Sequence, residues 1–186
     1  MRKEDLNRIM EYKNNDPFIR IFDFLRFCLK EDAKEPASLE DMDWDELYAF
    51  GNKQAILGVL FHGIKKLSDS PHRPNKQQIL KWYAACSFIE QANRQAYKDA
   101  SALTTLLQEK YGVHGCVLKG QTNALMYPDP YMRTSGDIDL WTDAKTLDII
   151  RISRQLDPKG EIGYHHIELS YFKTPVEVHF FPSFMG

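Results

Sequence analysis

The chain has 186 residues, of which 43% are hydrophobic and 27% are charged, a composition typical of a globular protein with a buried core. The net charge of −2 provides no strong positive field to attract nucleic acid, so any such contact must be local. No apolar run is close to the length of about 18 residues that a membrane span needs, and no apolar signal-peptide core follows the N terminus. The three cysteines form no CxxC pair. We therefore expect a soluble cytoplasmic protein with reduced thiols and no membrane partner.

The first 112 residues are predicted to be helical. Apolar residues recur at helical spacing in three segments: 16–30, 43–67 and 75–112. An Asp16-Pro17 pair marks the start of the first segment, the second is expected to break near Gly51-Asn52, and Gly112 is a natural end for the third. This pattern of apolar residues predicts a helical N-terminal region over residues 1–112.

Short apolar runs typical of strands follow from residue 113. Strands are predicted at 113–119, 137–142, 164–172 and 175–181, and helices at 120–127 and 143–156. Cys116 is expected in the core, Asp143 is a candidate helix cap, and the last two strands are expected to form a hairpin. The fold class is therefore α+β: a helical N-terminal half packed on a small mixed β-sheet, with domains over residues 1–112 and 113–186.

Asp137 and Asp139 stand one residue apart at the start of an apolar strand. Because strand side chains alternate between faces, both carboxylates are expected on one face, with Ile138 and Leu140 pointing into the core. Two adjacent like charges are tolerated where a divalent cation lies between them, and oxygen ligands suit Mg²⁺. The same spacing occurs in Asp41, Asp43 and Asp45, where a helix start predicts capping instead. The spacing alone leaves a metal site and a solvated turn equally open.

A third acid favours the metal site. Glu177 and His179 share one face of the last predicted strand. If this strand neighbours the aspartate strand, Glu177 completes a three-carboxylate cluster; Glu168 is a competing third acid, and a solvated Glu177 on an edge strand is the alternative. His165 and His166 are expected on opposite strand faces, which disfavours a transition-metal site.

A glycine between a strand and a helix start offers free backbone amides and a helix dipole to an anion. The residues beside this turn and just before the aspartates are candidates for phosphate contacts. Lys119 and Arg133 are equally open to being ordinary surface charges. The candidates are Lys119, Gly120, Gln121, Thr122, Arg133 and Ser135.

Four stretches, "LKG", "YPDPYMR", "GDIDLW" and "VEVHF", together resemble the nucleotidyltransferase superfamily of DNA polymerase beta. Within it, the chain resembles a bacterial family labelled uncharacterised nucleotidyltransferases, of the NTP_transf_5 type. The resemblance is specific over residues 113–181 and looser over residues 40–112.

The resemblance implies a role for each candidate. Asp137, Asp139 and Glu177 would hold Mg²⁺ on a nucleoside triphosphate such as ATP, and Glu177 could act as a base. Gly120 and its helix start would cradle the triphosphate. The reaction would transfer a nucleoside monophosphate to a hydroxyl on a small molecule, a protein or an RNA end, with release of pyrophosphate.

Two departures define the alternatives. The superfamily usually carries Gly-Gly or Gly-Ser where this chain has Gly120-Gln121, so Thr122 or Ser135 would have to supply the hydroxyl. Family members usually continue beyond the third acid, which implies a C-terminally truncated chain or an acceptor site elsewhere. A catalytically weak, antitoxin-like nucleotide-binding regulator is therefore the second hypothesis, and a purely structural helical protein is the third.

Overall fold

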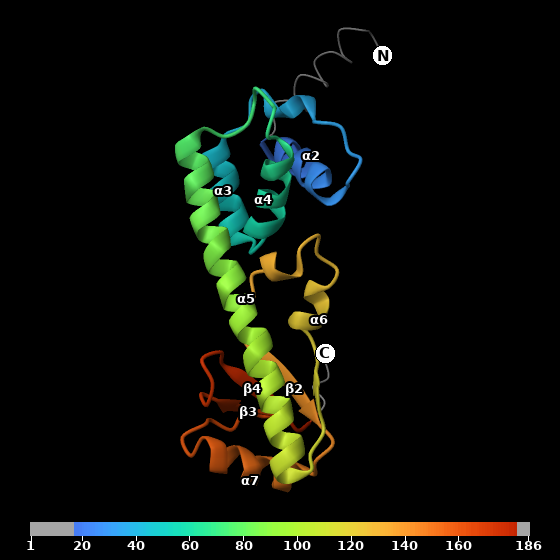
Figure 1. The fold of residues 1–186 in the computed structure, drawn as a ribbon, viewed down its shortest axis with the longest axis vertical. Helices are drawn as coiled ribbons and strands as arrows, with labels where there is room; N and C mark the ends of the chain where they lie inside the picture. Colours follow the sequence, from blue (N-terminus) through green and yellow to red (C-terminus); the bar gives the residue numbers. More distant parts are fainter. Residues whose placement is uncertain (1–16, 182–186) are drawn as a thin grey trace. The chain divides into compact units, whose positions relative to one another are not determined.

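The computed structural model describes residues 17–181 and shows a mixed α/β protein (Figure 1). Its contacts group the chain into two compact units, residues 1–88 and 89–186. The division falls inside the long helix α5 (Lys76–Tyr111), whereas helix gives way to strand after residue 112. Among the described residues, no helix combines the length and apolarity needed to cross a membrane.

The first unit is helical, as its periodicity predicted. Its elements are α2 (Pro17–Leu29), a 3₁₀ turn η1 (Ala37–Leu39), α3 (Trp44–Lys53), α4 (Leu57–Lys66) and the start of α5. Phe24 is fully buried and meets Trp44 edge to face at 5.4 Å between ring centroids, a favourable aromatic geometry. The expected start signal at Asp16 lies outside the described residues.

The predicted break near Gly51-Asn52 is confirmed, because α3 ends at Lys53 and α4 begins at Leu57. In the turn between them, Ala55 takes a positive φ of 58°. Gly51 is buried, and a Cβ there would lie 2.6 Å from Cδ1 of Leu60. Gly51 therefore serves the close approach of α4 to α3 rather than a helix break.

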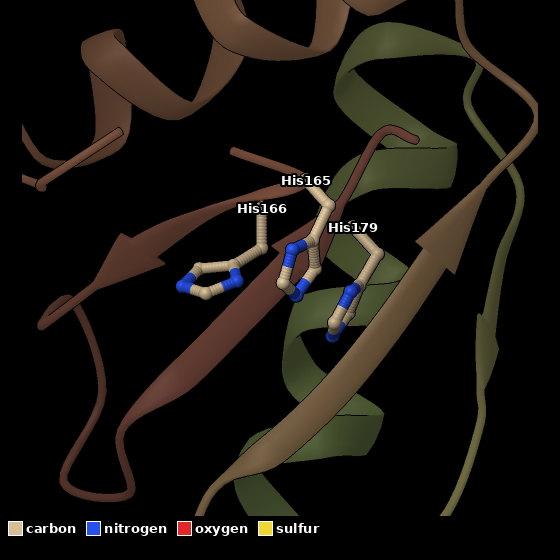
Figure 2. A group of neighbouring side chains, drawn as sticks. All are labelled: His165, His166 and His179. Atoms are coloured by element: carbon tan, nitrogen blue, oxygen red, sulfur yellow. The ribbon is translucent and has the colours of Figure 1, made fainter. Parts of the chain in front are cut away.

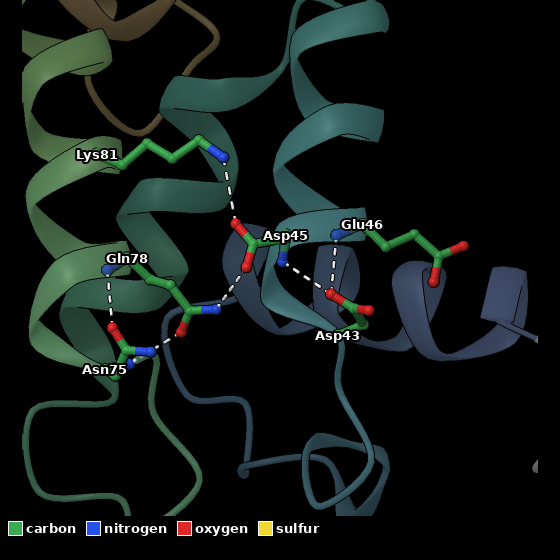
Figure 3. Close-up of polar contacts among 6 residues, drawn as sticks. All are labelled: Asp43, Asp45, Glu46, Asn75, Gln78 and Lys81. Carbon is green, nitrogen blue, oxygen red and sulfur yellow. Dashed lines mark hydrogen bonds and ion pairs between the residues drawn. The ribbon is translucent and has the colours of Figure 1, made fainter.

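The capping predicted for the first acidic triplet is confirmed at one position (Figure 3). Asp43 is the N-cap of α3, and its Oδ1 accepts hydrogen bonds from the amides of Asp45 and Glu46 at 2.9 and 3.0 Å. Asp45 instead accepts from Gln78 Nε2 at 2.9 Å and Lys81 Nζ at 3.2 Å on α5. These bonds lower the pKa of Asp45, so identical spacing serves two different local purposes.

The second unit contains a four-stranded sheet. Its elements are the rest of α5, β1 (Gly115–Val117), α6 (Gln121–Ala124), a 3₁₀ turn η2 (Pro130–Met132), β2 (Ile138–Thr142), α7 (Thr146–Leu156), β3 (His166–Leu169) and β4 (Val176–His179). The strand order is β1-β2-β4-β3. β2 and β4 run parallel, while β1 pairs with β2 and β3 with β4 in antiparallel fashion. The predicted hairpin of the last two strands is confirmed.

One face of this sheet is the core of the second unit. Ile138 and Leu140 of β2 and Val176 and Val178 of β4 are at most 1% exposed. They form one cluster with apolar residues of α5, α7 and β3: Ala96, Ala100, Leu103, Leu107, Ile149, Ile152, Ile167 and Leu169. Because side chains alternate along each strand, the opposite face of the sheet receives the polar residues of β2 and β4.

Three local expectations are wrong in this unit. Cys116 is exposed because β1 is a short edge strand. The N-cap position of α7 is Lys145; Asp143 accepts from the amide of His114 at 2.9 Å and pairs with its ring, contacts that lower the pKa of Asp143. The helix predicted over residues 120–127 is only the single turn α6.

Candidate active site

Asp139 and Glu177 lie side by side on the polar face of the sheet. They are register partners on the adjacent parallel strands β2 and β4. Ile138 and Leu140, on either side of Asp139, point into the core. The alternation expected from the sequence therefore holds for these two acids, and strand pairing brings together residues 38 positions apart.

Asp139 is only 3% exposed, so its charge requires compensation. Its Oδ1 lies 3.1 Å from Lys119 Nζ and 2.9 Å from His179 Nε2. The hydrogen bond with Asp139 raises the pKa of Lys119, and the charges of Asp139, Asp137 and Glu177 add to the effect. Lys119 therefore stays protonated and faces the acids.

Glu177 is half-buried beside the same histidine. Its Oε2 lies 3.6 Å from Nε2 of His179 and 3.6 Å from Nδ1 of His166. One ligand atom each from Asp139, Glu177 and His179 lie within 4.8 Å of one another. Within residues 17–181, Asp137 does not belong to this group; it stands just before β2, and its charge is felt by Lys119.

The glycine turn lies close to the acids. Gly120 takes φ +74°, and a Cβ there would be 3.9 Å from Nη1 of Arg133 and from the carbonyl oxygen of Asp137. Glycine is therefore favoured by the backbone conformation, whereas a Cβ at this position would make only ordinary van der Waals contacts. Lys119, Gly120 and Arg133 thus lie near one another, and their contact with phosphate stays a prediction.

The remaining phosphate candidates are placed differently. Thr122 Oγ1 donates to the carbonyl of Leu118 at 2.6 Å. Gln121 is 5% exposed, and its buried side-chain amide atoms have no hydrogen-bond partner within residues 17–181. Its backbone carbonyl accepts from Tyr97 Oη at 3.0 Å. Ser135 is half-buried in the loop before Asp137. The hydroxyl of Thr122 therefore already donates its hydrogen bond within its own turn.

Helix α5 holds the loop before β2 through a residue that sequence reasoning missed. Asn93 is 1% exposed, and its Nδ2 donates to the carbonyls of Tyr131 at 2.9 Å and Arg133 at 2.6 Å. The available signal was a polar residue within the apolar stripe of α5, between Ile89 and Ala96. Asn93 fixes the backbone from which the Arg133 side chain leaves.

The three histidines near the acids also differ from expectation. His165 and His166 were expected on opposite faces, yet both rings lie beside His179 (Figure 2). The alternation rule does not apply to His165, because β3 begins at His166. The pairing of β3 with β4 was predicted, but its register, which the sequence did not specify, places His166 opposite His179.

The donor set fits a hard divalent cation. Two carboxylates on adjacent strands supply the oxygen ligands that Mg²⁺ prefers, and Mg²⁺ commonly uses one or two carboxylates together with substrate phosphates. Asp139 is buried with its charge balanced by Lys119 and His179. Asp139 and Glu177 would hold such a cation, in competition with the ammonium group of Lys119.

The mixed sheet carries the paired acids beside a glycine turn, the combination expected for the nucleotidyltransferase class. Residues 40–181 match the model of a family described as uncharacterised nucleotidyltransferase, and the chain belongs to this family. No curated protein matches the chain, and no solved structure matches it. Family membership supports nucleotidyl transfer in general and a nucleotide substrate.

Proposed function

We propose that this protein is a Mg²⁺-dependent nucleotidyltransferase that moves a nucleoside monophosphate from a nucleoside triphosphate to a hydroxyl acceptor. The observation that carries the proposal is the pairing of Asp139 with Glu177 across β2 and β4, beside Lys119. The acceptor is a small molecule, a protein side chain or an RNA end.

The chain's residues divide the work as follows. Gly120 lets the triphosphate approach the backbone, and Lys119 and Arg133 neutralise its charge. Mg²⁺ held by the carboxylates would neutralise charge on the phosphates of the substrate. His179 donates to Asp139 and orients that carboxylate. Asp137, whose charge acts on Lys119, is proposed as a further Mg²⁺ ligand beside Asp139 and Glu177.

Glu177 is the proposed general base. It accepts the proton of the acceptor hydroxyl, whose oxygen forms a bond to the α-phosphorus. The bond from the α-phosphorus to the bridging oxygen breaks, and pyrophosphate leaves with the electron pair. Lys119 and Arg133 stabilise the charge that develops on the leaving group, which is the main catalytic contribution in phosphoryl chemistry.

A second candidate is a nucleotide-binding regulator without transfer activity. Two observations favour it: Thr122 Oγ1 is bonded to the carbonyl of Leu118, and Lys119 and His179 both contact Oδ1 of Asp139. If these contacts persist when nucleotide binds, Thr122 offers the phosphates no hydroxyl, and Oδ1 of Asp139 is closed to a cation.

Incubation with labelled nucleoside triphosphates, Mg²⁺ and cell extract as acceptor source tests the two candidates. Asp139→Asn and Glu177→Gln are each expected to lower transfer about 100-fold or more. Glu161→Gln is the matched control, because Glu161 belongs to the same unit and is exposed. Transfer that survives both substitutions contradicts the enzyme proposal, and nucleotide binding without transfer supports the regulator.

A further inference from the structure

A cluster of three imidazoles lies at the end of the sheet beside the paired acids. One ring nitrogen each from His165, His166 and His179 lie within 4.8 Å of one another. The ring centroids are 4.7 Å apart for His165 and His166, 5.4 Å for His165 and His179, and 5.6 Å for His166 and His179. Figure 2 shows the three side chains side by side.

The backbone holds these rings together. His166 and His179 are register partners in the antiparallel β3–β4 pair, so their side chains leave the same face of the sheet. The carbonyl of His165 accepts from the amides of Phe180 at 3.0 Å and Phe181 at 3.3 Å, which fixes His165 at the end of β4. The cluster is therefore set by strand pairing rather than by side-chain flexibility.

Two observations on the ring nitrogens point to a metal ion. Nε2 of His179 lies 2.9 Å from Oδ1 of Asp139. Such a carboxylate partner is the usual outer support of a metal-binding histidine. Nδ1 of His166 is buried and, among the described residues, has no hydrogen-bond partner. A buried nitrogen in this condition requires an explanation, and metal binding supplies one.

We propose that His165, His166 and His179 bind a transition-metal ion such as Zn²⁺, at a site separate from the one proposed for Mg²⁺. Three imidazole nitrogens suit zinc and its neighbours, whereas Mg²⁺ requires oxygen ligands. Three protein ligands leave a coordination position for water or a substrate atom. Oε2 of Glu177, assigned to the Mg²⁺ site, lies 3.6 Å from Nδ1 of His166. His179 links the two sites through Asp139.

The test measures metal binding by the full chain without nucleotide, so it is independent of the proposed transfer activity. Zn²⁺ is titrated in competition with a chromophoric chelator, in the presence of excess Mg²⁺. The expected result is a single Zn²⁺ per chain that Mg²⁺ does not displace. His165→Ala should weaken its affinity about tenfold or more, which corresponds to about 1.4 kcal/mol. His72→Ala, which removes an exposed histidine of the first unit, should leave the affinity unchanged.

Co²⁺ provides a second readout that needs no variant. Bound by three imidazoles in place of Zn²⁺, it should show the strong visible absorption of a low-coordinate ion rather than the weak absorption of a six-coordinate one. His165→Gln replaces His165→Ala if circular dichroism shows that the alanine variant does not fold. The proposal is overturned if wild-type protein binds no Zn²⁺, if Mg²⁺ displaces the ion, or if the His165 variant binds as tightly as wild type.

Discussion

Asp99 on α5 is predicted to be a main anchor of the loop that leads into β4. It is 6% exposed, and its Oδ2 accepts from Thr174 through the amide at 2.9 Å and Oγ1 at 2.8 Å. Its Oδ1 accepts from Gln95 Nε2 at 2.9 Å. Burial raises the pKa of Asp99, but the hydrogen bonds from Thr174 and Gln95 outweigh burial and lower this pKa.

Asp99→Ala removes both bonds to Thr174 and leaves its amide buried without an acceptor. At about 1.5 kcal/mol for each hydrogen bond to a charged group, we expect a loss of about 3 kcal/mol in the free energy of unfolding. That loss corresponds to a drop in Tm of roughly 6–12 °C for a chain of this size. Urea and thermal unfolding followed by circular dichroism measure it.

Thr174→Val separates the two bonds, because it removes the hydroxyl donor and keeps the amide. It should cost about 1.5 kcal/mol, half of the Asp99→Ala loss. Lys159 is exposed, so Lys159→Ala serves as a surface control. It should change the free energy of unfolding by less than about 0.5 kcal/mol. A Thr174→Val loss larger than the Asp99→Ala loss, or an Asp99→Ala change of Tm below about 2 °C, would refute the reasoning.

The same pair gives a pH dependence. The pKa of Asp99 is lower in the folded chain than its unfolded value of about 3.9. Its contribution is therefore fully present above the unfolded pKa and is lost as the pH falls through the folded pKa. The stability difference between wild type and Asp99→Ala should be constant near neutral pH and should shrink below about pH 4.

Three further predictions concern the helices. Asp43→Ala removes the cap of α3 and should cost about 1 kcal/mol in urea unfolding. Gly63→Ala should cost about 1–3 kcal/mol, because its Cβ would overlap Sγ of Cys28, and the double variant with Cys28→Ala should recover part of the loss. Gly112→Ala should cost about 1 kcal/mol in thermal unfolding, because φ is +65° at Gly112. Nothing lies within 4 Å of the added Cβ, so this loss comes from backbone strain alone.

Each of these has a control or a contrary outcome. Asp41→Ala makes the same charge change in the loop before α3 but keeps the N-cap. If it lowers the free energy of unfolding as much as Asp43→Ala does, the capping explanation is contradicted. Gly136→Ala adds a Cβ with nothing within 4 Å and should be close to neutral. A Gly63→Ala variant as stable as wild type would contradict the packing. For Gly112, Asn is expected to be tolerated better than Ala; the reverse order would argue against backbone strain.

The sequence by itself determined the local features of this protein. Helical spacing predicted α2 to α5, and period-two alternation predicted that Ile138 and Leu140 face the core. The strand, glycine and acid motifs were sufficient to identify the family. These features follow from the chemistry of neighbouring residues, so they can be predicted without knowing how distant segments meet.

Only the tertiary structure decided which distant residues meet. Parallel pairing of β2 with β4 places Glu177 beside Asp139, and the register of the β3–β4 hairpin places His166 opposite His179. Asp43 and Asp139 occur in the same D-x-D spacing, yet one caps a helix and the other is buried against Lys119. Strand order and register depend on contacts between residues far apart in the chain, which spacing along the sequence does not specify.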